Sequence, residues 1–312
     1  MPASVPIDEH LVGVVDVGGS HARAALVAWE TSGPVLGARA ESDVDAHGPR
    51  EVLLGQVAEP LDGLGASEWV VALPGPFDYE RGRGDFTGVG KFGALAGLDL
   101  RSALADRLGI LPERLHFLND AVAYGLGEWW GGGRQACRSV CVTLGTGVGS
   151  VFLVDGAPVE SGPGVPPHGW VHLLRVDGGP LEDTVSTRAV VSAYAGSSGR
   201  TTSVREIASA ARAGDQEAAE ALAGAMRALG RALAPGLAAF GAQELVVGGS
   251  IARAWDLLEA PLAHGLADGA SRRSSAPPPA VRASVLLDDA PLLGAAWWFS
   301  RRARPASPGP RP

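Results

Sequence analysis

Lysine is almost absent from this 312-residue chain, and cysteine is rare. Lys91 is the only lysine, so arginine supplies nearly all of the positive charge, an imbalance that we attribute to coding bias. The net charge is −8. Because binding of phosphates over a broad face requires a basic patch, this charge gives no support for a nucleic-acid partner or a charged membrane surface.

The two cysteines, Cys137 and Cys141, match neither a disulfide framework nor a zinc-ribbon spacing. We expect both to be reduced, buried thiols. No apolar run reaches the roughly 18 residues of a membrane span. Residues 1–10 lack the basic and apolar regions of a secretion signal. The sequence therefore predicts a cytoplasmic protein without a membrane partner.

Two strand–turn–strand patterns, at residues 11–28 and 139–156, are the main features that the chain does contain. The turn residues are Gly18, Gly19 and Ser20 in the first pattern and Gly145, Thr146 and Gly147 in the second. Such turns can present backbone N–H groups to an anion, although an ordinary hairpin turn is the alternative for each one alone. The pair predicts an internal duplication, with two phosphate-binding turns facing each other across a cleft. Asp16, at the end of the first strand, is a candidate ligand for a metal ion.

A carboxylate follows another apolar strand at the junction Leu118-Asn119-Asp120, where helical spacing begins. Ligands usually bind at such strand ends in an α/β sheet. Asp120 is therefore a candidate general base that takes a proton from a hydroxyl group. The alternative is that Asn119 or Asp120 only caps the helix.

Other stretches give weaker signals. The loop of residues 78–90 is long enough to be a functional rim. Lys91-Phe92 could lie on that rim, but we expect a solvated lysine. Because Phe92 follows Lys91, this is not a Walker A loop. His168 and His172 have metal-ligand spacing only on a helix, which Gly169 argues against.

Six motifs together resemble the ROK family of bacterial sugar kinases and related repressors, which belongs to the superfamily of actin and hexokinase. The resemblance covers about residues 12–300. The motifs are Asp16-Val-Gly-Gly-Ser-His, Leu118-Asn-Asp-Ala-Val-Ala-Tyr-Gly-Leu-Gly-Glu128, Thr143-Leu-Gly-Thr-Gly-Val-Gly, Leu181-Glu182, Val246-Val-Gly-Gly-Ser250 and Pro291-Leu-Leu-Gly-Ala-Ala296.

This resemblance implies an α/β protein with the two-lobed, actin-like or ribonuclease H-like sugar kinase fold and a central cleft. The expected lobes are residues 11–121 plus 291–303 and residues 122–290, with disordered tails at 1–10 and 304–312. The implied activity is ATP- and Mg²⁺-dependent phosphorylation of the primary hydroxyl of a sugar, with Asp120 as the base.

The resemblance also implies the binding residues. Those expected to bind the sugar are Asn119, Asp120, His172, Glu182 and Gly75. Those expected to bind ATP are Asp16, Gly18, Gly19, Ser20, His21, Gly145, Thr146, Gly147, Gly248 and Gly249, with Asp16 also holding Mg²⁺.

The chain departs from the family at its sugar-binding segment, where Gly169 replaces a glutamate in His168-Gly169-Trp170-Val171-His172. The family's cysteine-rich segment is absent, so we expect no structural zinc. Because a site built for a hydroxyl group discriminates strongly when that partner changes, an amino sugar such as kanosamine or a C7-cyclitol is an alternative to plain glucose.

Two further alternatives are a sugar-sensing regulator and a non-catalytic sugar or nucleotide binder. The regulator is disfavoured because only 15 residues precede Asp16, and the binder because Asp120 and both glycine turns are present. The pairs Trp129-Trp130 and Trp297-Trp298 would suit a homodimer surface, although a core role is at least as reasonable.

Overall fold

The computed structural model describes residues 11–31, 33–86, 90–132, 135–270 and 277–303. The chain packs as two compact units. Unit 1 contains the residues up to Gly127 and those from Asp288 onward, and unit 2 contains Glu128–Leu287. The tails predicted to be disordered lie outside the described residues. Within the described ranges, every helix is too short or too polar to span a lipid bilayer.

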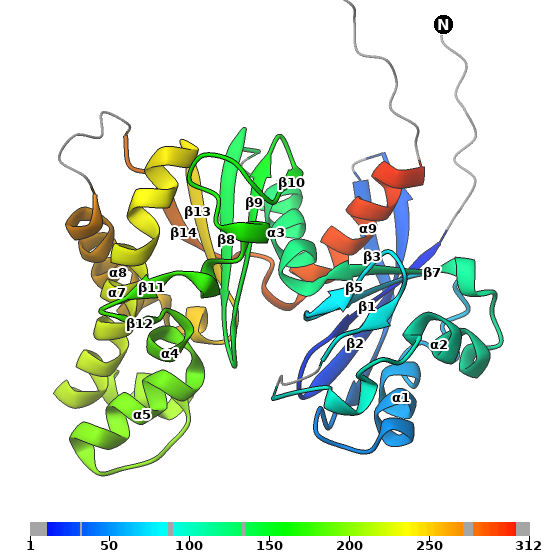
Figure 1. Cartoon of the computed structure of the whole chain (residues 1–312), viewed down its shortest axis with the longest axis horizontal. Coiled ribbons are helices and arrows are strands. Elements are labelled where there is room, and N and C mark those ends of the chain that lie inside the picture. Colours follow the sequence, from blue (N-terminus) through cyan, green and yellow to red (C-terminus); the bar gives the residue numbers. More distant parts are fainter. Residues whose placement is uncertain (1–10, 32, 87–89, 133–134, 271–276, 304–312) are drawn as a thin grey trace, which may run out of the picture. The chain divides into compact units, whose positions relative to one another are not determined.

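Unit 1 contains a five-stranded sheet in the order β3-β2-β1-β4-β7 (Figure 1). The strands are β1 Val12–Val17, β2 His21–Glu30, β3 Gly33–Asp43, β4 Glu68–Leu73 and β7 Leu115–Asn119. The first three form an antiparallel meander, and β1, β4 and β7 are parallel. A small antiparallel pair, β5 Phe77–Asp78 and β6 Arg83–Gly84, overlaps the segment 78–90 that was expected to be a loop.

Both faces of this sheet are covered by helices, as the near-continuous apolar strands predict. Val15 and Val71 pack into one core with α1 (Arg50–Ala58) and α2 (Leu100–Leu108). Val14 and Val70, which point to the opposite face, pack into a second core with α9 (Ala290–Ala303). The helix α3 (Asp120–Gly131) begins in unit 1 and ends in unit 2.

Unit 2 repeats this topology in the order β10-β9-β8-β13-β14. The strands are β8 Arg138–Leu144, β9 Val148–Val154, β10 Ala157–Val159, β13 Glu244–Gly248 and β14 Ala280–Ala283. Again three strands form an antiparallel meander, and β8, β13 and β14 are parallel. The shared order agrees with the internal duplication predicted from the two strand–turn–strand patterns.

The helices of unit 2 are α4 Glu182–Val185, α5 Thr187–Ser198, α6 Val204–Arg212, α7 Gln216–Phe240 and α8 Trp255–Gly269. They share one large apolar core with the sheet. Two further strands, β11 Arg175–Val176 and β12 Gly179–Pro180, form a short hairpin. The alanine-rich helices α6 and α7 are separated by a short break that contains Gly214.

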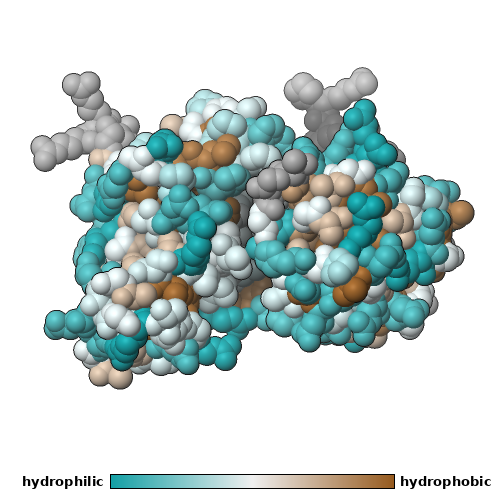
Figure 2. Space-filling model, turned by 60° about the horizontal axis from the view of Figure 1, so that its bottom comes forward, coloured by the Kyte–Doolittle hydropathy of each residue, from teal (hydrophilic) through white to brown (hydrophobic). Residues whose placement is uncertain are grey.

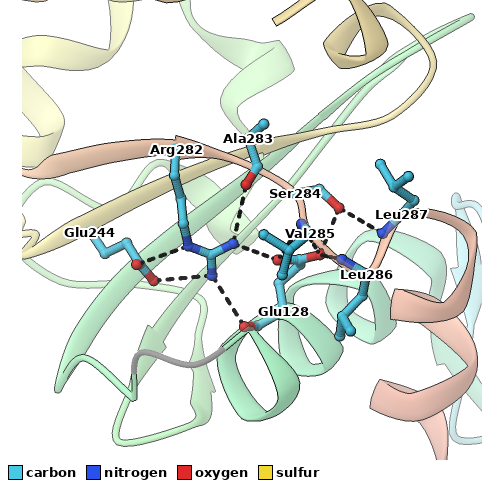
Figure 3. A network of polar contacts seen from close by, with 8 residues as sticks. All are labelled: Glu128, Glu244, Arg282, Ala283, Ser284, Val285, Leu286 and Leu287. Carbon is cyan, nitrogen blue, oxygen red and sulfur yellow. Dashed lines mark hydrogen bonds and ion pairs between the residues drawn. The ribbon is translucent and has the colours of Figure 1, made fainter.

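In unit 2, a buried carboxylate on α3 binds the residues that follow β14 (Figure 3). The Glu128 side chain is fully buried and accepts hydrogen bonds from Ser284 Oγ at 2.6 Å and Leu286 N at 2.8 Å. Arg282 Nη1 lies 2.6 Å from Glu128 Oε2, and its Nε lies 3.0 Å from Glu244 Oε1. A buried charge is tolerated only when paired and hydrogen-bonded, and Glu128 satisfies both conditions.

The cysteine prediction is half right. Cys141 is a buried free thiol on β8, but Cys137 is exposed because it precedes the first residue of that strand. The tryptophans 129, 130, 297 and 298 are partly buried.

Candidate active site

Three predicted residues of unit 1 lie at the same edge of its sheet. In the parallel register Asp16 on β1 pairs with Ala72 on β4, and Ala72 pairs with Leu118 on β7. Asp16, Gly75 just beyond β4 and Asp120 just beyond β7 therefore share the carboxyl edge of three adjacent strands. This is the edge where α/β sheets bind ligands.

At the junction of β7 and α3, one residue caps the helix and the next is available for chemistry. Asn119 Oδ1 accepts a hydrogen bond from Val122 N at 3.1 Å, so Asn119 is the residue that caps the helix. The only donors to the Asp120 carboxylate in the described part of the chain are backbone N–H groups, its own and that of Ala121 at 2.8 Å. Asp120 is therefore available for a substrate hydroxyl.

Burial of Asp120 favours proton uptake. Burial raises the pKa of Asp120, and the Ala121 N–H and the Lys91 ammonium lower it in part. Burial and the nearby Asp120 carboxylate raise the pKa of Asp16 to about 7, although Arg23 opposes this effect. Two like charges in a partly buried site resist simultaneous ionisation, so the pair can accept a proton or a cation near neutral pH.

In the turn between β1 and β2, one backbone N–H group is bonded within the turn and the next two have no acceptor among the described residues. Gly18 N donates to His21 O at 2.8 Å. Within the described residues, no acceptor bonds the N–H groups of Gly19 and Ser20. The His21 imidazole lies beside Glu41 and Asp43 instead, at 3.6 and 3.4 Å. The backbone of the turn, more than the His21 side chain, is thus free to bind an anion.

Sequence reasoning missed Tyr79 at this edge. Its hydroxyl accepts a hydrogen bond from Asn119 Nδ2 at 2.9 Å and donates one to Leu73 O at 3.2 Å. A Cβ on Gly75 would lie 3.4 Å from the same hydroxyl. Tyr79 therefore orients the Asn119 amide. The only local signal was an aromatic residue in a loop that follows a buried strand.

Lys91 lies beside the first glycine turn, as the rim alternative for this residue allows. Its side chain is partly buried, and its Cδ, Cε and Nζ atoms lie 3.4 Å from the position of a Cβ on Gly19. The preceding loop residues 87–89 lie outside the described residues.

The second glycine turn, in unit 2, is supported from several sides. Gly145 N donates to Gly147 O at 3.0 Å, and Thr187 N donates to Gly145 O at 2.8 Å. Glu182 Oε2 accepts from Val148 N at 3.0 Å. A Cβ on Gly147 would lie 3.1 Å from the same carboxylate oxygen. Glu182 therefore holds the turn and still has a second oxygen for a ligand.

The segment after β13 packs against this turn. Gly249 has a φ of 85°, and a Cβ there would collide with the Leu144 carbonyl. The Ser250 hydroxyl lies 3.6 Å from the Cβ position of Gly145. Ser250, which the motif contained but the predicted site did not, thus belongs beside the turn.

The segment around His172 forms two 3₁₀ turns, Pro167–Gly169 and Val171–Leu173, so His168 and His172 do not share a helix. Trp170 packs between their rings, with ring centroids 4.6 and 5.6 Å from its own. Burial lowers the pKa of His172, while the Glu182 carboxylate raises it in part. Gly169 is buried with a φ of 73°, a conformation that a glutamate would adopt only with strain.

In the described part of the chain, no group of three or more histidine, cysteine or acidic side chains is arranged to hold a metal ion. The carboxylate of Asp16 remains a candidate because Mg²⁺ usually takes one or two protein carboxylates and completes its shell with water and phosphate oxygens.

A family model described as the ROK family matches residues 12–302, which is nearly all of the described sequence. The chain belongs to the ROK family. It is 29% identical to a glucokinase of Thermotoga maritima over 92% of this chain and 96% of that protein.

Two solved structures show the same fold. The crystal structure of a ROK family glucokinase from Streptomyces griseus, in complex with glucose and AMPPNP, is 22% identical with a TM-score of 0.75, covering 92% of this chain and 98% of that one. A ROK hexokinase from Thermus thermophilus is 23% identical with a TM-score of 0.70, covering 94% and 99%. The fold is therefore the actin-like α/β fold of the ROK sugar kinases, as predicted.

Proposed function

We propose that this chain transfers the γ-phosphoryl group of ATP to the primary hydroxyl of a hexose or hexose-like ring, with Asp120 as the general base. Membership of the ROK family and the similarity to a glucokinase support the broader assignment, an ATP-dependent carbohydrate kinase.

The observation that carries the proposal is the state of Asp120 at the strand edge. Its carboxylate is bonded only by backbone N–H groups among the described residues, and burial raises its pKa. A base works best when its pKa approaches the operating pH, so both features favour proton removal from a hydroxyl group. Asn119, which Tyr79 orients, keeps one amide hydrogen for a neighbouring sugar hydroxyl.

Phosphoryl transfer depends mainly on positioning and on charge stabilisation. The open N–H groups of Gly19 and Ser20 would bind phosphate oxygens in unit 1. Gly145–Gly147 and Gly248–Gly249 would bind ATP in unit 2. Asp16 fits a magnesium site because a divalent cation would relieve its repulsion with Asp120. Bound Mg²⁺ would neutralise phosphate charge.

His172 and Glu182 would hold the sugar ring. Where the family has a carboxylate, this chain has Gly169, whose positive φ fits glycine, followed by the Trp170 ring between two histidines. This change favours the second candidate, a kinase for an amino sugar such as kanosamine or for a C7-cyclitol. A lost carboxylate contact changes which ring substituents are accepted.

The test measures ADP release from Mg·ATP with glucose, mannose, glucosamine, 3-amino-3-deoxyglucose and a C7-cyclitol. We expect turnover with at least one of them. The 6-deoxy analogue of the accepted hexose should give no turnover and should inhibit competitively, since it keeps the ring contacts without the acceptor hydroxyl. If folded protein gives no ADP release above background with any acceptor, the kinase proposal fails.

A homodimer stays a prediction. The exposed large apolar residues of the described chain are scattered, and Figure 2 shows small separate apolar patches on a mostly hydrophilic face.

A further inference from the structure

We propose that Lys91 is a catalytic residue whose ammonium binds the phosphoryl group as it passes to the hydroxyl deprotonated by Asp120. This inference rests on the proposed function and adds a residue that the sequence motifs do not contain.

The position of Lys91 is the first argument. Its Cδ, Cε and Nζ atoms all lie 3.4 Å from the point that a Cβ on Gly19 would occupy. The ammonium is therefore beside a turn residue whose N–H has no acceptor in the described chain. A cation and an open N–H group side by side form an anion site that neither would form alone.

The charges around Lys91 point the same way. In the described residues, no carboxylate lies within ion-pair distance of its ammonium, whereas arginines such as Arg23, Arg107 and Arg212 have an acidic partner. The positive charge of Lys91 still acts on Asp120, where it opposes the increase in pKa that burial causes. An ammonium close to the base and without its own counter-ion is suited to bind negative charge supplied by a substrate.

The backbone next to Lys91 is held in a strained conformation. Phe92 has a φ of 57°, which a bulky residue rarely adopts. It is held there by a hydrogen bond from its N–H to Ala46 O at 2.7 Å and by packing of its buried ring on Phe86, with centroids 5.6 Å apart. Two residues later, Arg50 Nε donates to Ala94 O at 2.9 Å. Backbone strain of this kind concentrates at functional sites, where it fixes a side chain in place.

The kinetic test compares Lys91→Met, Lys91→Arg and the control Arg81→Met, which removes an exposed charge from the same loop. We expect Lys91→Met to lower kcat by about 100-fold, the usual effect of losing one charge-stabilising donor. The KM for the sugar should change by less than about threefold, because the contact forms with the transferred group. Lys91→Arg should recover part of the loss, and Arg81→Met should match wild type.

Two readouts separate catalysis from packing. Methionine keeps the unbranched apolar part of the side chain and removes the ammonium group, so a packing role predicts near-wild-type kcat in Lys91→Met. The acid limb of the kcat/KM profile should also move to higher pH in this variant, because the charge that lowers the pKa of Asp120 is gone. Thermal unfolding checks that each variant is folded, and wild-type kcat in folded Lys91→Met overturns the proposal.

A binding measurement keeps the test independent of kinase activity. Reductive methylation with ¹³C-formaldehyde labels the single lysine and the N-terminal amine, and Lys91→Met identifies the Lys91 signal. We expect this signal to shift saturably with Mg·AMPPNP and with inorganic tripolyphosphate. If wild type accepts no sugar but the signal shifts, the proposed function fails while the anion site stands. A signal that does not move when calorimetry shows Mg·AMPPNP bound overturns the anion site.

Discussion

The two glycine turns have the same strand context and different electrostatic surroundings. The turn of unit 1 lies with two carboxyl groups of raised pKa, Asp16 and Asp120, and with the Lys91 ammonium. The turn of unit 2 is held by Glu182 through Val148 N and by the neutral residues Thr187 and Gly249. Duplication thus repeats the scaffold, while strand ends and loops supply different chemistry. We infer that unit 1 carries proton and phosphoryl transfer and that unit 2 mainly holds ligands.

The largest expected effect comes from Asp120→Asn. Without a base, kcat should fall by at least about two orders of magnitude, while ATP binding measured by calorimetry stays nearly unchanged. Asp106→Asn, the same change at an exposed position of α2, is the control and should leave kcat unaltered. A wild-type rate in Asp120→Asn would remove this residue from the mechanism.

Glu182→Gln tests the other side of the comparison. Loss of one charge-assisted hydrogen bond to the ring should raise the KM for the accepted sugar by about tenfold. The kcat should stay within a few fold, because the contact is present before and during transfer. Asp183→Asn, an exposed neighbour, is the control. A fall in kcat as large as that of Asp120→Asn would contradict the division between the units.

The pH dependence of stability should also differ between the units. The pKa of Asp16 is raised from 3.8 to about 7, so between these values folded unit 1 retains a proton that the unfolded chain loses. The unfolding free energy contributed by Asp16 therefore decreases as pH rises through this window. In unit 2 hydrogen bonds lower the pKa values of Glu206, Asp215 and Asp256, so their contributions are lost as pH falls.

Urea unfolding of the ligand-free protein from pH 4.5 to 7.5 measures this difference. Asp16→Asn should lessen the decrease in unfolding free energy seen for wild type toward pH 7.5. If the unfolding free energy of the two proteins changes equally with pH, the ionised form of Asp16 is not destabilised in the folded state.

The smallest expected effect is that of Gly169→Ala. An L side chain at a φ of 73° should cost about 1 kcal/mol. Gly224→Ala, inside α7 with open space around the added Cβ, should instead stabilise the protein by about 0.5–1 kcal/mol. Thermal unfolding measures both, and equal signs for the two variants would contradict the strain assigned to Gly169.

The sequence predicted those parts of the fold that depend on local patterns. The strands from Val12 and from Ser139 are apolar runs followed by glycine turns, so their positions could be read directly. The position of Lys91 over Gly19 could not, because it depends on a loop and on the strained Phe92. Tyr79 was missed for a related reason, since its partner Asn119 is distant in the chain.

The same limit applies to Gly169 and to Glu128. A φ of 73° leaves no periodic signal, and glycine in a loop is unremarkable in a sequence. Glu128 reads as a polar residue near a helix end, but it is fully buried and bonded to residues more than 150 positions later. Contacts between such distant segments are decided by packing of the whole unit.

The burial of Glu128 has a mechanical consequence. The chain passes from unit 1 to unit 2 at Gly127–Glu128 and returns at Leu287–Asp288. Glu128 is the first residue after the first crossing. Its carboxylate accepts hydrogen bonds from the backbone N–H groups of Val285 and Leu286, which lie just before the second crossing. The two ends of the unit 2 segment are thereby fastened to each other, so loss of this one carboxylate would release both ends of the segment at once.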